Sequence, residues 1–195
     1  DFDFYEDIAA ASLTDDDPIL IIGSGTGRLA LRLAAAGHLV HGIEIEPAMI
    51  ERARRKLDSF PQRSRVTFHH GDALTLPLDQ TFGMAIIPYN TLMHFLSLEE
   101  QRTLLTRIHT WLHPGGLLVI DLPNAGESFA AQDTEAITLE RVFIDQDTGD
   151  RVMQQSSSRL DRAEQLMYVT WIYDAIGSDG VLKRTIVPVV IYYFF

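Results

Sequence analysis

The sequence predicts an α/β protein: a doubly wound, mainly parallel sheet followed by a C-terminal antiparallel β-meander. Two observations lead to this prediction. Up to about residue 125, short apolar runs alternate with segments of helical periodicity, the order expected of parallel strands joined by helices. Beyond Asn124, extended patterns follow one another directly, with only turn-forming residues between them. The composition, 46% hydrophobic and 22% charged over 195 residues, is that of a globular protein with a sizeable core.

The apolar runs of the first part have the length of buried strands. They cover residues 18–22, 39–45, 65–69, 82–87 and 117–122. Helical patterns begin at Gly27, Pro47 and Ser97. Proline is favoured in the first turn of a helix, and Ser97 followed three residues later by Glu100 has the spacing of a capping box. Each helix therefore follows a strand, as right-handed crossovers of a parallel sheet require.

The second part reads as four successive strands. They cover residues 137–145, 151–160, 165–174 and 181–195, and the separators are rich in Asp and Gly. Pro188 predicts that the last strand lies at a sheet edge or contains a bulge, because proline cannot donate a ladder hydrogen bond. We expect a core over residues 1–125 and an antiparallel extension over residues 126–195. Because the chain opens on Asp1 and ends within an aromatic run, we also expect it to be cut from a longer protein.

The charge balance argues against two classes of partner. Lys and Arg number 16 and Asp and Glu number 27, so the formal net charge of −11 repels phosphate backbones and anionic lipids. No apolar run approaches the roughly 20 residues that span a bilayer. The absence of cysteine excludes disulfides, thiolate metal sites and a cysteine nucleophile, and fits a reducing compartment. We therefore expect a cytoplasmic protein that binds neither nucleic acid nor membrane.

The candidate site lies where the first three strands end. Gly23-Ser24-Gly25-Thr26-Gly27 joins the first strand to its helix, and such a turn lets backbone approach a ligand beside the free N–H groups of a helix N-terminus. The second strand ends with Glu44, and the third is followed by Gly71-Asp72-Ala73. Open α/β sheets bind ligands at the carboxyl ends of their strands. We expect the glycine loop and both carboxylates to face one crevice.

Taken in this order, these segments resemble the class I S-adenosylmethionine-dependent methyltransferases, especially the bacterial enzymes of the small-molecule type. The matching segments are 19–27 (ILIIGSGTG), 42–49 (GIEIEPAM), 70–73 (HGDA) and 113–117 (HPGGL), so the resemblance covers residues 1–125. It implies a Rossmann-like sheet of order 3-2-1-4-5, S-adenosylmethionine as cofactor, and in-line methyl transfer to a small-molecule acceptor. In such an enzyme the extension would roof the substrate pocket or form a homodimer contact, since an uncovered strand edge invites pairing.

The resemblance also assigns roles to the cofactor-binding residues. Gly23, Ser24, Gly25 and Gly27 would hold the methionine part, Glu44 both ribose hydroxyls, and Asp72 with Ala73 the adenine. An ionised Glu44 can accept charge-assisted hydrogen bonds from a vicinal diol. Ile45, Met49 and Leu74 are placed to sandwich the purine.

Pro88, Tyr89, Asn90 and His94 follow the fourth strand and are expected beside the transferred methyl group. Tyr5 belongs to residues 1–12, which resemble an N-terminal segment that folds over the cofactor. His94 is the first candidate for a base, with Tyr89 beside it, because imidazole titrates near neutrality.

Two of these residues have plainer interpretations. His94 can simply begin the turn into the helix at Ser97, and the segment around Tyr5 can be a terminal helix that packs Phe4 and Ile8. His109 and His113 have the i, i+4 spacing of zinc ligands on a helix, but no third ligand is near, so we expect no metal site.

The sequence departs from the family at Ile21, where members usually carry an acid two positions before the first glycine. The support that such an acid gives to the cofactor's ammonium group is therefore missing or supplied elsewhere. This departure motivates an alternative hypothesis, a cofactor-binding or assembly module that has lost catalysis. A third hypothesis is an NAD(P)-dependent oxidoreductase. The glycine-rich fingerprint of dinucleotide-binding domains, however, needs a third glycine at the position where this chain has Arg28.

Overall fold

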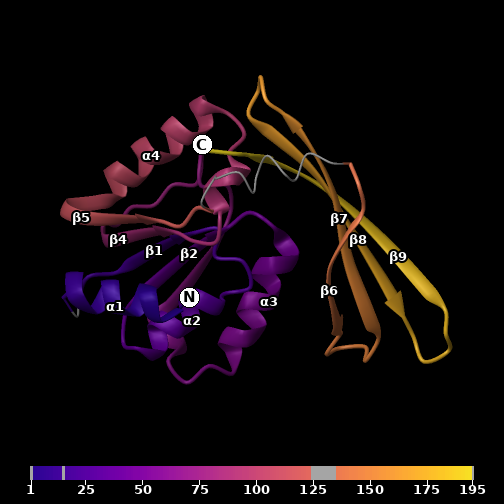
Figure 1. The fold of residues 1–195 in the computed structure, drawn as a ribbon. Helices are drawn as coiled ribbons and strands as arrows, with labels where there is room; N and C mark the ends of the chain where they lie inside the picture. The colour runs from indigo at the N-terminus through magenta and orange to yellow at the C-terminus, as the bar shows by residue number, and fades with distance from the viewer. Residues whose placement is uncertain (1, 15, 124–134, 195) are drawn as a thin grey trace. The chain divides into compact units, whose positions relative to one another are not determined.

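The computed structural model describes residues 2–14, 16–123 and 135–194. The chain divides into two compact units, one from Asp1–Leu92 and Ser97–Leu122, the other from Met93–Leu96 and Pro123–Phe195. The first unit contains a five-stranded sheet with helices, and the second contains a four-stranded sheet (Figure 1). The boundary expected between residues 125 and 126 lies outside the described residues, and the division at that point stays a prediction.

The sheet of the first unit is parallel at every pairing and has the order β3-β2-β1-β4-β5, which confirms the predicted architecture. Its strands are β1 (Ile19–Ile22), β2 (Val40–Glu44), β3 (Val66–His70), β4 (Phe82–Ile87) and β5 (Leu112–Ile120). Every residue of β1 and β4 is buried. Strands in the middle of a parallel sheet are covered on both faces, which is why their sequences are continuously apolar rather than alternating.

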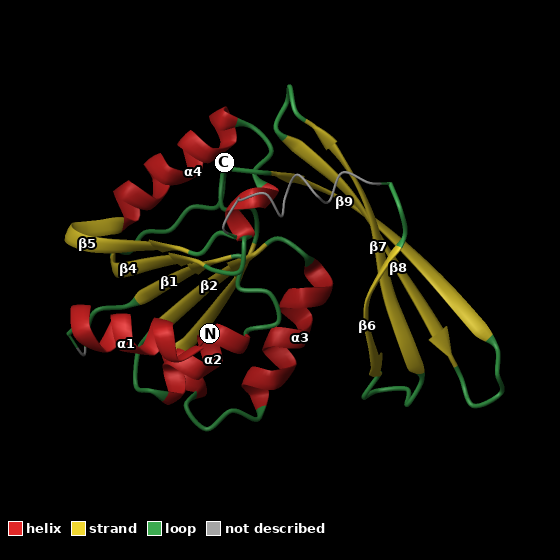
Figure 2. Ribbon diagram, viewed as in Figure 1, coloured by secondary structure: helices red, strands yellow, loops and turns green. Residues whose placement is uncertain are grey.

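Helices cover both faces of this sheet. They are α1 (Phe2–Ser12), α2 (Arg28–Ala35), α3 (Pro47–Asp58) and α4 (Leu98–Trp111), with short 3₁₀ turns η1 (Arg63–Arg65) and η2 (Thr91–His94). Figure 2 shows α1, α2 and α3 on one side and α4 on the other. The predicted capping box is present, since the Ser97 hydroxyl accepts from the Glu100 N–H and the Glu100 carboxylate accepts from the Ser97 N–H. Pro47 opens α3 as predicted.

The fifth strand differs from the prediction at both ends. It begins at Leu112, directly after α4, and ends at Ile120, whereas the sequence predicted a strand over residues 117–122. The register passes from Phe82 opposite Leu112 to Met84 opposite Leu117, so the Pro-Gly-Gly segment forms a bulge within the strand instead of a turn before it. His113 consequently lies in β5 and shares no helix with His109, and its Nε2 is 3.2 Å from Asp17 Oδ1.

The second unit is an antiparallel sheet of order β6-β7-β8-β9, as the turn-separated strand patterns predicted. The strands are β6 (Thr138–Ile144), β7 (Arg151–Asp161), β8 (Leu166–Ile176) and β9 (Leu182–Tyr192). Pro188 lies in β9, which is an edge strand of this sheet, as its missing N–H requires. Within the described residues no helix is both long and apolar enough to cross a membrane.

Candidate cofactor-binding site

The loop after β1 is shaped by three glycines that all have a left-handed backbone. Their φ angles are 70° at Gly23, 56° at Gly25 and 79° at Gly27. A Cβ on Gly23 would lie 2.5 Å from the Thr91 methyl group, and one on Gly27 would lie 2.7 Å from the Phe68 ring, so these two glycines allow close packing. A Cβ on Gly25 would meet nothing within 4 Å. The loop therefore packs tightly at its two ends and faces open space at Gly25.

A lysine from α3 fixes the outer side of this loop. The Lys56 ammonium group donates to the carbonyl and to the hydroxyl of Thr26, at 3.0 and 2.9 Å. Partial burial, with the neighbouring Arg28 and Arg52, lowers the pKa of Lys56 below its ordinary value. The bonds to Thr26 hold the loop in one conformation beside the N-terminus of α2.

Glu44 is the centre of the site's hydrogen-bond network. Its side chain is largely buried, with 8% of the residue exposed. One carboxylate oxygen accepts from the Gly25 N–H at 2.7 Å, and the other accepts from the Glu46 N–H at 2.9 Å. A carboxylate offers about four acceptor positions. Two of them remain beyond these backbone bonds, so Glu44 is fixed in orientation and can still accept from two hydroxyls.

The ends of β1, β2 and β3 are joined to one another by backbone hydrogen bonds. The N–H groups of Gly23 and Ser24 both donate to the Ile43 carbonyl at 2.9 Å, and the Gly71 N–H donates to the Glu44 carbonyl at 2.9 Å. The carboxyl ends of β1, β2 and β3 are therefore held side by side, as the prediction of a single crevice requires.

Ser24 carries the clearest sign that a polar ligand belongs here. Its hydroxyl oxygen is buried and has no hydrogen-bond partner among the described residues. Gly42 leaves room for this side chain, since a Cβ there would lie 2.7 Å from the Ser24 hydroxyl oxygen. A buried hydroxyl without a partner is costly in free energy, whereas a bound polar group would satisfy it.

The turn after β3 places Asp72 and Ala73 at the same edge. Asp72 Oδ1 accepts from the Leu74 N–H at 2.8 Å, which shapes the turn and leaves Oδ2 without a partner among the described residues. The Arg107 guanidinium of α4 donates to the carbonyl of Ala73 at 2.8 Å and also to the carbonyl of Leu76. Arg107 therefore connects the backbone of the turn to α4.

Two large apolar side chains stay exposed after β2. Ile45 is 63% exposed and Met49 is 43% exposed. Both follow Glu44 closely in the sequence, at the edge where the ribose was predicted. Covering apolar surface is favourable by about 25 cal/mol per Å², so a flat apolar group such as a purine would gain from contact with them.

The segment after β4 is held by a residue that the sequence argument did not single out. Asp121 Oδ2 accepts from the Tyr5 hydroxyl at 2.9 Å and from the Tyr89 N–H at 3.2 Å. Burial and this carboxylate raise the pKa of Tyr5 above its ordinary value, so the hydroxyl stays a donor. Asp121 was missed because the fifth strand was predicted to run through it. An acid at the end of a strand or just after it was the signal that identified Glu44 and Asp72, and it applies equally to Asp121, which directly follows β5.

The residues predicted near the methyl group have different surroundings. Pro88 is buried, and Tyr89 is more than one-third exposed, with the Arg28 guanidinium 5.6 Å from its ring centroid. Burial raises the pKa of Tyr89, while Arg28 acts in the opposite direction. His94 is exposed at the end of η2, in the Met93–Leu96 segment of the second unit, and its role as a base stays a prediction.

The N-terminal segment is a helix, α1, in which Tyr5 is 2% exposed and packs in the main core cluster. Phe4 is exposed, while Ile8 is partly buried against the same cluster, so only one of the two apolar residues of the plainer interpretation packs inward.

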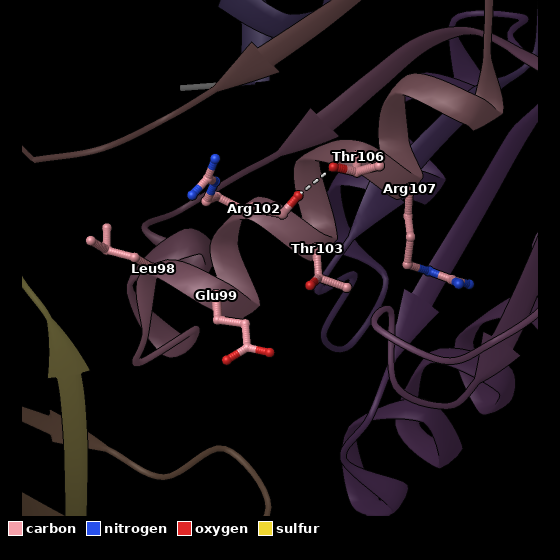
Figure 3. A pocket seen from close by; sticks show the side chains of 6 residues that line it. All are labelled: Leu98, Glu99, Arg102, Thr103, Thr106 and Arg107. Carbon is pink, nitrogen blue, oxygen red and sulfur yellow. Dashed lines mark hydrogen bonds between the residues drawn. The ribbon is translucent and has the colours of Figure 1, made fainter.

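A hollow of about 450 Å³ lies along α4, lined by side chains from Leu98 to Arg107 (Figure 3). Thr106 in this hollow bonds to the carbonyl of Arg102 in the preceding turn. None of the predicted site residues lines it.

The chain's own residues fit an adenosyl cofactor. The open loop at Gly25, the unpaired Ser24 hydroxyl and the free acceptor positions of Glu44 lie together at one sheet edge. A family described as methyltransferase domain matches residues 19–116, just over half of the chain, and that span includes the glycine loop, Glu44 and Asp72. The chain belongs to the methyltransferase-domain family.

Relatives and solved structures agree with this membership. The carboxy-S-adenosyl-L-methionine synthase of Photorhabdus laumondii is 30% identical over 132 residues, which make up 66% of this chain and 49% of that protein. The CcbJ methyltransferase from Streptomyces caelestis is 25% identical, with a TM-score of 0.79 over 100% of this chain and 73% of its own. CalS10, an amino pentose methyltransferase from Micromonospora echinaspora, shares the fold at 22% identity, with a TM-score of 0.78 over 99% of this chain and 75% of its own.

This methyltransferase domain spans about half the length of the curated relatives it matches. The resemblance to the class I S-adenosylmethionine-dependent methyltransferases is confirmed. Ile21, which replaces the usual acid, is fully buried in the core cluster and pairs in register with Gly42 of β2 and Ile86 of β4.

Proposed function

We propose that this methyltransferase domain binds S-adenosylmethionine and transfers its methyl group to a small-molecule acceptor. The observation that carries the proposal is the state of Glu44, a buried carboxylate held by the Gly25 and Glu46 N–H groups with two acceptor positions left. A vicinal diol carries two neighbouring hydroxyl donors, which suit these two positions. Family membership favours methyl transfer over the NAD(P)-dependent reaction.

The residues contribute binding and alignment in this proposal. Glu44 accepts from the two ribose hydroxyls, the Ser24 hydroxyl and the loop N–H groups bind the polar methionine end, and Asp72 Oδ2 accepts from the adenine amine. Ile45 and Met49 cover the purine and exclude water from it. The cofactor supplies an electrophilic methyl group on a sulfonium when bound. Displacement at such a carbon depends on alignment and a dry site, which fits a site with a rigid loop.

Several finer points are part of the same proposal. Tyr89 and Pro88 border the acceptor, and His94 takes a proton from a hydroxyl or ammonium acceptor. The net charge of −11 supports a small-molecule acceptor over nucleic acid. A roofing or dimer-forming role for the antiparallel sheet and a cytoplasmic location stay predictions.

Isothermal titration with S-adenosylhomocysteine tests the cofactor assignment. We expect binding at one site per chain, and a folded protein that gives no heat at high concentration would contradict the proposal. Mass spectrometry of acceptor mixtures incubated with S-adenosylmethionine then separates the remaining hypotheses. A methylated product supports transfer, whereas tight binding without any product across a broad metabolite panel would favour the non-catalytic module.

A further inference from the structure

The turn after β4 has a backbone that its residues rarely adopt unaided. Tyr89 and Asn90 have φ angles of 50° and 63°, in the left-handed region that favours glycine. Residues in such conformations persist where the surrounding structure determines them, and they gather at ligand sites. Something in the fold must therefore hold this turn.

Asp121 holds it through both its side chain and its backbone. The carboxylate accepts from the Tyr89 N–H at 3.2 Å, and the Asp121 carbonyl accepts from the Asn90 N–H at 3.2 Å. The Asp121 N–H in turn donates to the Ile87 carbonyl at 3.0 Å. One residue at the end of β5 thus fixes both left-handed residues of the neighbouring turn.

The same carboxylate connects the turn to α1. It accepts from the hydroxyl of Tyr5, whose ring is buried and lies 6.1 Å from the Tyr89 ring in an edge-to-face arrangement. Phe2 makes a second edge contact with Tyr89 at 6.4 Å, and the Arg28 guanidinium lies near that ring at 5.6 Å. Tyr89 is therefore flanked by side chains of α1 and α2 and anchored by Asp121, just beyond β5.

The other side of the turn touches the glycine loop. Thr91, one residue beyond Asn90, packs so closely on Gly23 that a single added carbon at Gly23 would lie 2.5 Å from its methyl group. Any shift of the turn would therefore move Thr91 against the loop or away from it. The position of the turn and the shape of the cofactor loop are mechanically linked.

We propose that Asp121 is a positioning residue, which locks the Tyr89–Asn90 turn and α1 in the arrangement that the cofactor loop needs. This inference rests on the proposed cofactor site and adds a residue to it. Asp121 acts through Tyr5 and Tyr89, and the main consequence of its loss is a looser turn beside the methyl group rather than a lost ligand contact.

The test combines amide hydrogen exchange without ligand and titration with S-adenosylhomocysteine. In Asp121→Ala we expect faster exchange at the Tyr89 amide and in α1, and at least tenfold weaker binding. Tyr5→Phe removes one of the two donors and should weaken binding about threefold. The double variant should bind no more weakly than Asp121→Ala alone, because the two residues act through one hydrogen bond. Asp121→Asn keeps an acceptor oxygen and should restore most of the affinity.

Asp17 provides the matched control. It also bridges an N-terminal segment to β5: its carboxylate accepts from the Thr14 N–H at 2.9 Å and lies 3.2 Å from His113 Nε2. Unlike Asp121, it precedes β1 and so lies at the amino-terminal ends of the parallel strands. Asp17→Ala should leave affinity within twofold and the Tyr89 amide protected. Unchanged exchange at Tyr89 in Asp121→Ala, or additive losses in the double variant, would overturn the inference. A wild-type protein that binds no S-adenosylhomocysteine would refute the proposed function, while the exchange experiment would still decide whether Asp121 locks the turn.

Discussion

Replacing Glu44 by glutamine tests the central electrostatic feature of the site with almost no change in shape. In the native protein each carboxylate oxygen takes one backbone N–H, at 2.7 Å from Gly25 and 2.9 Å from Glu46. A glutamine has one oxygen and one NH₂ group, so one of these backbone donors would face another donor. Leaving a largely buried donor unsatisfied costs about 1–3 kcal/mol, and we expect the free energy of unfolding to fall by that amount.

The effect on binding should be larger than the effect on folding. Hydrogen bonds to charged groups contribute about 1.5–3 kcal/mol each, and Glu44→Gln removes the acceptor for one ribose hydroxyl and the charge for the other. A loss of about 3 kcal/mol corresponds to roughly 100-fold weaker binding of S-adenosylhomocysteine. Isothermal titration at neutral pH measures this loss of affinity, and urea denaturation separately measures the change in the free energy of unfolding.

Glu46→Gln is the control for this experiment. Glu46 carries the same charge two residues away, but among the described residues its side chain accepts only from the Ala48 N–H at the start of α3. We expect it to bind S-adenosylhomocysteine within twofold of the wild type. A folded Glu44→Gln protein that binds as tightly as Glu46→Gln would refute the assignment of Glu44 to the ribose.

Three further outcomes are expected from single substitutions. Gly27→Ala combines a φ of 79° with a Cβ 2.7 Å from Phe68 and should lower the free energy of unfolding by about 2 kcal/mol or more, whereas Gly25→Ala, in open space, should cost about 1 kcal/mol. Equal losses in urea denaturation would contradict this division of roles. Ser97→Ala removes an N-cap and should cost about 1 kcal/mol, measured the same way. Burial and the neighbouring His69 lower the pKa of His41 to about 4, below its unfolded value of about 6.5. As the pH falls, the unfolded state therefore takes up the proton first. The free energy of unfolding should have its full value above pH 6.5 and decrease as the pH is lowered towards 4, and His41→Gln should flatten that decrease.

The structure itself explains why the local features were predictable. The capping box at Ser97, the proline opening α3 and the placement of Pro188 on an edge strand depend on a few neighbouring residues and their backbone requirements. The same holds for the glycine loop, because glycine is the residue type that readily tolerates positive φ angles such as those at Gly23, Gly25 and Gly27. Features of this kind are written in short segments of sequence.

The end of β5 shows where such reasoning stops. The residues from Pro114 to Gly116 have the composition of a turn, yet they form a bulge within β5 where it pairs with β4. As a result β5 ends at Ile120. Asp121 thereby becomes a strand-end residue that reaches Tyr5, 116 positions away in the sequence. A hydrogen bond between such distant positions depends on how the sheet and α1 pack, and no local pattern encodes it.

The sequence by itself determined the order of strands and helices, the glycine loop, the acid that ends β2 and the acid that follows β3, because periodicity and backbone preference act over a few residues. The tertiary structure alone decided which polar groups of the site already have hydrogen-bond partners within the protein. It showed that Glu44 is bound by two backbone N–H groups, that the Ser24 hydroxyl lacks a partner within the described residues, and that Asp121 joins α1 to the turn after β4. Hydrogen-bond satisfaction and packing are set by atoms brought together from distant segments, which only the folded chain defines.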